Sequence, residues 1–258
     1  MLVSDETLRN TRYHFDAFGK LVKRVKLYGT GTPQAEAATK YGRDLLSRIA
    51  NITDPNGNQW LYQYDGLSRR YDVQDPDLGH WTYVYDAAGR LTNQTDAKSQ
   101  QTVLDYDSMD RVWRKTVSGP GLTTETTTNT FDDTSANGHA GYSNAGKLTD
   151  SVKGSFTERS DYDAGGRPIK QRWAGINDVS SEREIDTTWW HGGELRSRTF
   201  PSGSGSGASS YVASYGYDRA GRLSSASNGA NSLVGATTYN GRSQAMADAT
   251  ARFAAALA

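Results

Sequence analysis

The stretch Tyr83-Val84-Tyr85-Asp86-Ala87-Ala88-Gly89-Arg90-Leu91 returns along the chain in related forms. Its first four residues have counterparts one period earlier, at residues 62–65, and one period later, at residues 104–107. The aspartates that end these blocks follow one another at intervals of 21 residues. A repeat of fixed period predicts a body built from stacked copies of one supersecondary unit.

Ten units can be aligned on this template, and eight of them carry Asp at the fourth position. The fourth-position residues are Asp16, Asp44, Asp65, Asp86, Asp107, Asp132, Asp163, Trp190, Asp218 and Asn240. The residue before is aromatic in nine of the ten units. The residues expected to build the repeat are Tyr62, Tyr64, Asp65, Tyr83, Tyr85, Asp86, Gly89, Arg90, Leu91, Tyr106, Asp107, Tyr162, Asp163, Tyr215, Tyr217, Asp218, Gly221, Arg222 and Leu223.

Each unit has the signature of a β-hairpin. Residues two apart in a strand share a face, so Tyr83 and Tyr85 are expected on one side of the sheet. Asp86 favours the start of a turn because its carboxylate accepts backbone N–H groups, and Gly89 supplies a positive φ. The segment 90–95 then returns as a second strand. Asp54-Pro55-Asn56-Gly57 is typical of the turns between units.

The sequence therefore predicts an all-β fold in which tandem hairpins form a long antiparallel strip. Because strands twist, this strip should curl, with a thin aromatic core. We expect a repeat region over residues 1–242, with the tenth unit cut short at Arg242, and an Ala-rich tail over 243–258 with helical propensity. Residues 133–141 are expected to form an exposed loop at a hairpin tip, and 201–210 a long loop between hairpins.

Composition excludes several classes of function. The 29 basic residues balance the 29 acidic ones, so nothing in the net charge favours nucleic acid or an anionic membrane as a partner. The chain has no cysteine, which excludes disulfides and thiolate metal sites. No apolar stretch is long enough for a membrane helix, and residues 1–25 lack the apolar region of a signal peptide.

The repeated Tyr-Asp pairs resemble the Rhs/YD-repeat family of bacterial Rhs proteins, C components of insecticidal toxin complexes and animal teneurins. The pairs that carry the resemblance are Tyr64-Asp65, Tyr85-Asp86, Tyr106-Asp107, Tyr162-Asp163 and Tyr217-Asp218. The resemblance implies a spiralling β shell that, in bacterial members, encloses a C-terminal toxic domain. It also implies a secreted or cell-surface protein. No counterpart of the family's shell-closing core is recognisable after Asn240, so we interpret the chain as a shell fragment or remnant.

The histidines and paired aspartates of the chain are residue types that often carry catalysis or bind metals. The histidines His14, His80, His139 and His191 lie in different repeats without metal-ligand spacing, and His14, at the outward second position of its unit, is expected to be exposed. The carboxylate pairs Asp105/Asp107 and Asp161/Asp163 each include a turn residue of the repeat, which favours a structural role. We therefore predict no catalytic, cofactor-binding or metal-binding residue.

The recurrent arginines Arg48, Arg69, Arg90, Arg111, Arg167 and Arg222 are expected to pair with turn aspartates or carbonyls. A basic ladder for polyanionic glycans is the alternative.

The leading hypothesis is a non-enzymatic shell segment, whose partners are other repeat or core segments and an enclosed effector domain. One alternative is a surface adhesion module that binds glycans. The other is a self-cleaving or glycan-acting enzyme.

Overall fold

The computed structural model describes residues 2–4, 10–28, 35–135, 138–175, 182–201, 210–229, 231–235 and 237–246. Within these ranges the secondary structure consists of strands and turns, without a helical segment. The chain divides into two compact units, residues 1–106 with 115–125, and residues 107–114 with 126–258. The division passes through β11 (Val112–Ser118) and the start of β12 (Glu125–Phe131). The all-β prediction is confirmed.

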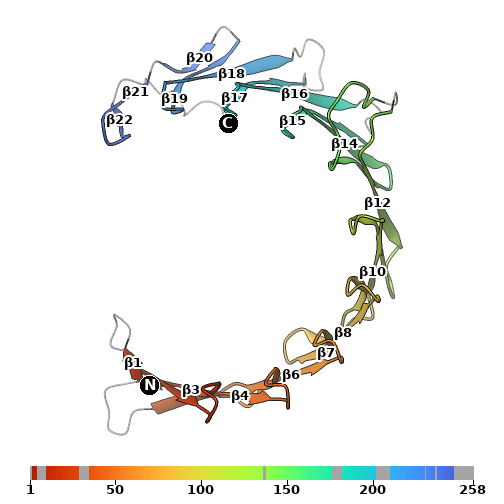
Figure 1. The fold of residues 1–258 in the computed structure, drawn as a ribbon, viewed down its shortest axis with the longest axis vertical. Helices are drawn as coiled ribbons and strands as arrows, with labels where there is room; N and C mark the ends of the chain where they lie inside the picture. The colour runs from red at the N-terminus through yellow and green to blue at the C-terminus, as the bar shows by residue number, and fades with distance from the viewer. Residues whose placement is uncertain are drawn as a thin grey trace. The chain divides into compact units, whose positions relative to one another are not determined.

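The first unit is an antiparallel meander in which each strand pairs with the next in sequence (Figure 1). Its strands are β1 (Leu2–Ser4), β2 (Asn10–Phe15), β3 (Leu21–Tyr28), β4 (Ala35–Arg43), β5 (Ile49–Thr53), β6 (Gln59–Tyr64), β7 (Arg70–Asp75), β8 (Gly79–Tyr85), β9 (Leu91–Thr95) and β10 (Gln101–Tyr106).

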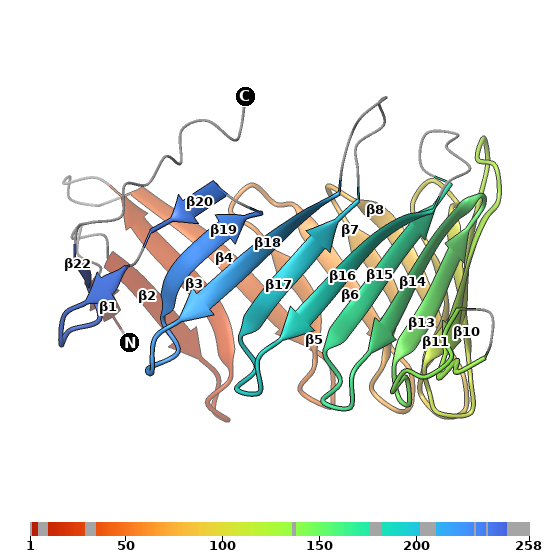
Figure 2. The ribbon, with the colours of Figure 1, turned by 90° about the horizontal axis from the view of Figure 1, so that it is seen from above.

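The second unit repeats this arrangement, and Figure 2 shows its strands running side by side. Beyond β12 its strands are β13 (Leu148–Lys153), β14 (Phe156–Tyr162), β15 (Pro168–Ala174), β16 (Arg183–Trp189), β17 (Leu195–Phe200), β18 (Tyr211–Tyr217), β19 (Leu223–Asn228) and β20 (Asn231–Val234). A separate two-stranded hairpin follows, made of β21 (Thr238–Tyr239) and β22 (Ala245–Met246).

The hairpin tips share one turn geometry. In the unit of Asp86, the Asp86 N–H donates to the carbonyl of Arg90, and the Gly89 N–H donates back to the carbonyl of Asp86. Trp190, which replaces the usual Asp, makes the same two backbone bonds with Glu194 and Gly193. The geometry of the turn therefore does not require the Asp side chain.

A β-bulge follows the turn. Tyr85 pairs with Leu91 and Val84 pairs with Asn93, so Thr92 is an extra residue in the returning strand. The same shift recurs between β6 and β7 and between β18 and β19. Bulges of this kind increase the local twist of a sheet. The repeat pattern does not predict these bulges.

The core is thin, and the buried apolar side chains of the described residues are aliphatic, each 9% exposed or less. They are Val25, Leu27, Val73, Ala213 and Ala226. Every described tyrosine of the repeat is only half-buried. The expected aromatic core is therefore wrong in kind, because each unit is a single sheet (Figure 1).

Two expectations about irregular regions need correction, and two fall outside the structure. The tenth unit is not cut short at Arg242: Asn240 and Gln244 close its turn, and Ala245 pairs with Tyr239. The insertion at 133–141 is exposed only in part: Thr134, Ser135, Ala140 and Gly141 are exposed, but His139 is only 1% exposed. The helical tail beyond Met246 and most of the 201–210 loop lie outside the described residues.

Candidate functional site

The turn carboxylate of each repeat organises its own hairpin tip. Asp65 Oδ1 accepts the backbone N–H groups of Leu67 and Arg69, each at 2.9 Å, and Oδ2 accepts the Nε–H of Arg69 at 2.7 Å. The same side-chain pairing joins the Asp and the Arg four residues later at Asp44, Asp86, Asp107, Asp163 and Asp218. These aspartates are thus fully engaged in local structure.

The arginine then crosses to the next repeat. The guanidinium carbon of Arg69 lies 4.8 Å from the centre of the Tyr85 ring, and its Nη1–H donates to the carbonyl of Asp86 at 3.1 Å. The Tyr85 hydroxyl donates to the carbonyl of Arg70 at 2.8 Å. We call this set of contacts between neighbouring repeats the Asp-Arg-Tyr clamp. It confirms that the recurrent arginines pair with turn aspartates and carbonyls.

The clamp recurs with variations of the aromatic residue. Arg48, Arg90 and Arg222 lie over tyrosine rings at 4.4–4.7 Å. Arg111 lies 4.3 Å from the Phe131 ring, where no hydroxyl is present, and also pairs with Asp132. In the eighth unit the Trp189 indole N–H donates to the carbonyl of Pro168. Stacking on an aromatic face is the shared element, worth about 0.5–1 kcal/mol at an exposed site.

The remaining repeat residues support the same geometry. Gly89 and Gly221 have φ of 87° and 74°. Leu91 and Leu223 pair directly opposite Tyr85 and Tyr217. The other tyrosines of the repeat also contact nearby residues. Arg70 lies over the Tyr62 ring, and Trp81 stacks on Tyr83. The hydroxyl groups of Tyr106 and Tyr162 donate to the carbonyls of Leu91 and Leu148, and the Tyr215 carbonyl accepts from the Trp190 indole.

The turn geometry shifts the acidity of its groups. The backbone amides of Arg69, Arg90 and Arg111 lower the pKa of Asp65, Asp86 and Asp107 respectively, and the paired guanidinium adds to this effect. Hydrogen bonds from Arg167 and Arg222 do the same for the pKa of Asp163 and Asp218. A general acid needs a raised pKa, whereas the pKa of these carboxyl groups is lowered, so they are ionised and accept hydrogen bonds.

A buried polar cluster in the second unit departs from the repeat. The insertion in the sixth unit folds back so that His139 Nδ1 lies 2.6 Å from Asp161 Oδ1. Asp161 is fully buried and also accepts hydrogen bonds from Arg172 and Asn144. His139 Nε2 lies 3.0 Å from Asp150 Oδ2, and Arg159 pairs with the other oxygen of Asp150. The cluster brings together residues from the insertion, β13, β14 and β15.

Sequence reasoning missed this cluster for a definite reason. Asp163 is a turn residue as predicted, but Asp161, two positions earlier, is buried under the insertion. His14 is exposed as expected, and His80 and His191 are exposed too, whereas His139 is buried. Two features of the sequence could have pointed to it: a histidine within the insertion, and Asp161, an extra aspartate in the first strand of the following unit. Their three-dimensional meaning depends on the path of the loop.

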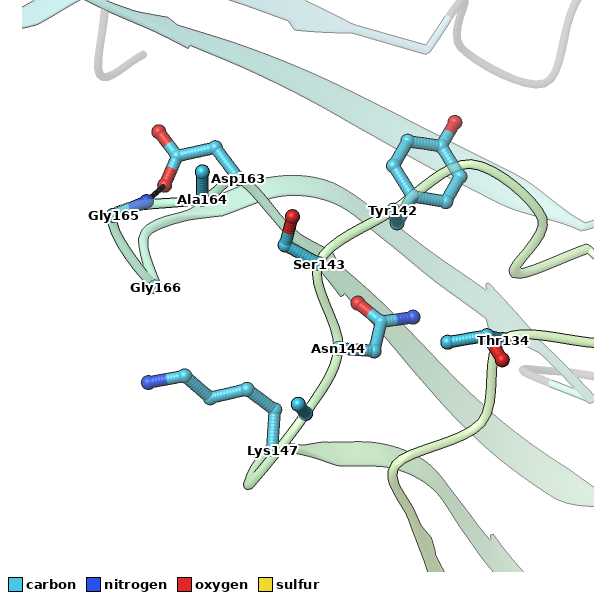
Figure 3. A pocket seen from close by; sticks show the side chains of 10 residues that line it. Thr134, Tyr142, Ser143, Asn144, Lys147, Asp163, Ala164, Gly165 and Gly166 are labelled. Atoms are coloured by element: carbon cyan, nitrogen blue, oxygen red, sulfur yellow. Dashed lines mark hydrogen bonds between the residues drawn. The ribbon is translucent and has the colours of Figure 1, made fainter.

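An open cleft of about 560 Å³ lies beside the cluster, between the insertion and the next hairpin tip (Figure 3). Its walls include Thr134, Asn144 and Lys147 on one side, and Asp163 with Gly165 on the other. The Asp163 carboxylate accepts the Gly165 N–H and is occupied by its own turn. The cleft is shallow and carries no arrangement of nucleophile and base.

Comparisons with known proteins identify the repeat. Residues 85–130 match the family model of the RHS repeat, so the resemblance to this family is confirmed over that segment. A search of curated proteins found no match. Within the described residues, no helix is long and apolar enough to cross a membrane.

Solved structures share the fold over almost the whole chain. One is a Photorhabdus luminescens Tc holotoxin pore with a variant of TccC3, with 15% identity and a TM-score of 0.73 over 92% of this chain. Another is the TcdB2–TccC3 complex without its hypervariable C-terminal region, with 16% identity and the same TM-score and coverage. The chain spans only 12–13% of the length of these chains.

Proposed function

We propose that this chain is a non-enzymatic segment of a YD-repeat shell, and that the longer protein to which such a segment belongs encloses an effector domain. The observation that carries the proposal is the Asp-Arg-Tyr clamp. It uses the recurrent charged and aromatic side chains of each repeat to hold the next repeat, so the repeated residues serve assembly of the sheet. Partners of the segment are then other repeats, a closing core and the enclosed domain.

Chain length supports the same proposal. The solved chains with this fold are much longer, since 92% of this chain covers only 12–13% of them. A one-layer sheet with half-buried tyrosines encloses nothing by itself, and further repeats would extend it. By the same resemblance, the longer protein is secreted or presented at the cell surface.

The reading frame on both sides of this segment provides the first test. We expect further repeats, a shell-closing core and a variable domain downstream. In that longer protein, limited proteolysis should spare the downstream domain for as long as the shell stays intact. Replacing Arg69, Arg90 and Arg111 together by Ala should expose it to cleavage, because three successive clamps are lost.

Lys98→Ala is the matched control, since Lys98 is a cationic side chain exposed in a turn between units. It should leave the digestion pattern unchanged. Equal digestion of the downstream domain in the native and triple-variant proteins would contradict encapsulation.

The glycan and enzyme alternatives have less support. The arginines proposed for a glycan ladder stack on rings and donate to carbonyls of the next repeat. The paired carboxylates at 105/107 do not lie in a catalytic arrangement, because Asp107 caps its own turn. A purified chain that stays intact and turns over no glycan substrate is the result that the structural proposal expects.

A further inference from the structure

The insertion in the sixth unit brings three residues with metal-binding side chains close together. Asp133 and His139 come from the insertion and Asp150 from β13. One ligand atom from each of these three residues lies within 4.8 Å of the others. We propose that these residues bind one Zn²⁺ ion, which fastens the insertion to the sheet.

The state of His139 is the independent observation behind this proposal. The side chain is 1% exposed, and its Nε2 atom is buried without a hydrogen bond. Asp150 Oδ2 lies 3.0 Å from this nitrogen, but not in hydrogen-bonding geometry. An unsatisfied buried nitrogen is unfavourable by about 1–3 kcal/mol, and a bound cation would satisfy it.

The other side of the ring is already arranged as in metal sites. Metal-binding histidines usually donate their second ring N–H to a carboxylate, which fixes the tautomer and the orientation of the ring. His139 Nδ1 lies 2.6 Å from the fully buried Asp161. Asp161 is in turn held by Arg172 and Asn144. With the Nδ1 proton directed at Asp161, the Nε2 lone pair faces Asp150.

The His139–Asp150 distance suits Zn²⁺, while the Asp133 carboxylate, within 4.8 Å of both, has to move closer to complete the site. Tetrahedral Zn²⁺ with bonds of about 2.0–2.1 Å separates its ligand atoms by roughly 3.3 Å, close to the His139–Asp150 distance. The carboxylates of Asp133 and Asp150 supply two negative charges, and Arg159, which pairs with Asp150, is also paired with Glu182. Arg172 balances Asp161 separately. A set with one imidazole and two carboxylates favours Zn²⁺ over Ca²⁺ and Mg²⁺, which prefer oxygen ligands alone.

The ion could reach the site from the open cleft. Asp133 and Asp150 are half-buried, and the cleft is lined by Thr134 and Asn144 (Figure 3). Asn144 also donates to the carbonyl of Asp133 and to Asp161, so it connects the cleft wall to the cluster. Three protein ligands would leave the fourth position of the ion to water.

The test is titration of the tag-free, chelator-treated chain with Zn²⁺ by calorimetry, together with the absorption spectrum of the Co²⁺-substituted protein. We expect one equivalent of Zn²⁺, a tetrahedral Co²⁺ spectrum, and no displacement by Ca²⁺. His139→Ala and Asp133→Asn should each weaken Zn²⁺ binding by at least about tenfold. His80→Ala removes an exposed histidine that also pairs with an aspartate, and it should bind as the native chain does.

The alternative is an imidazolium held between Asp150 and Asp161, which binds no metal. Absence of Zn²⁺ binding to the native chain overturns the proposal. So does binding that survives both His139→Ala and Asp133→Asn, or that His80→Ala reduces equally. Asp133 is half-buried, so Asp133→Asn decides the question even where loss of the buried histidine disturbs folding.

Discussion

At the scale of single residues, the hairpin turn requires one residue with a positive φ. The position three residues after the turn Asp has a positive φ whether it holds glycine or not, as Gly89 at 87° and Ser47 at 62° show. Glycine adopts this region freely, while other L-residues are less stable there by about 1–2 kcal/mol. Some copies of the repeat therefore carry removable strain.

Ser47→Gly should stabilise the chain by about 0.5–1 kcal/mol, since relief of the left-handed backbone exceeds the extra entropy of glycine in the unfolded state. The bond from Arg43 to the Ser47 carbonyl is retained. Urea unfolding measures the change. Ser47→Ala is the control and should be close to neutral, and Gly89→Ala should destabilise. A loss of stability in Ser47→Gly would refute the argument.

The same turns make stability depend on pH. The folded pKa values of Asp65, Asp86 and Asp107 lie below those of the unfolded chain, so the unfolded state binds more protons in acid. The stabilisation is complete above the unfolded pKa of about 4 and is lost as pH falls through the lower folded values. Thermal melting between pH 2 and 7 should show a flat region above about pH 5 and a decline below about pH 4. Asp86→Asn should make that decline less steep, and an unchanged profile would count against the assignment.

At the scale of elements, hairpins are held to one another by a few side-chain contacts as well as by backbone pairing. An isolated hairpin is marginal, and stacking neighbours supplies the stability of repeat proteins. The clamp hydroxyl bonds of Tyr64, Tyr106 and Tyr239 lie at half-buried positions, where they are partly shielded from water, whereas that of Tyr85 lies at an exposed position.

Tyr64→Phe should destabilise the chain by about 0.5–1.5 kcal/mol, because its half-buried hydroxyl bond to the Ile49 carbonyl is lost while stacking with Arg48 is kept. Tyr71→Phe is matched in chemistry, but its hydroxyl bonds to Gln63 at an exposed position and should matter little. Chemical denaturation of both variants gives the comparison. Equal effects would show that the clamp hydroxyl contributes no more than a surface hydrogen bond.

At the scale of the whole molecule, each unit is one open sheet whose outer end strand is paired on one side only. Within the described residues, β1 pairs only with β2, and β20 pairs only with β19. An open edge is a template for pairing with another chain. A shell segment surrounded by further repeats would not expose such edges.

The isolated chain should therefore self-associate as its concentration rises, and a version extended by its flanking repeats should do so less. Sedimentation velocity over a hundredfold range of concentration checks this. Lys98→Ala, distant from both edges in sequence, is the control and should behave as the native chain. A strictly monomeric native chain would argue against open edges in solution.

The sequence by itself determined the all-β class, the hairpin unit and the positions of its turns. These features can be predicted because the same local pattern occurs ten times, and because the preferences of Asp and Gly for turns and of Tyr for strands depend only on residues a few positions away. Even the unit with Trp190 in place of Asp follows the pattern set by its neighbours. The pairing of Arg69 with Asp65 could likewise be read from spacing alone.

Only the tertiary structure decided which aromatic ring each arginine contacts, where the bulges lie and what the insertion does. Arg69 reaches Tyr85, 16 residues away, and His139 meets Asp161, 22 residues away. Such contacts depend on register and on the path of a loop, which local propensity does not specify. The half-buried tyrosines have the same cause: burial depends on how many layers pack together, and each unit has one.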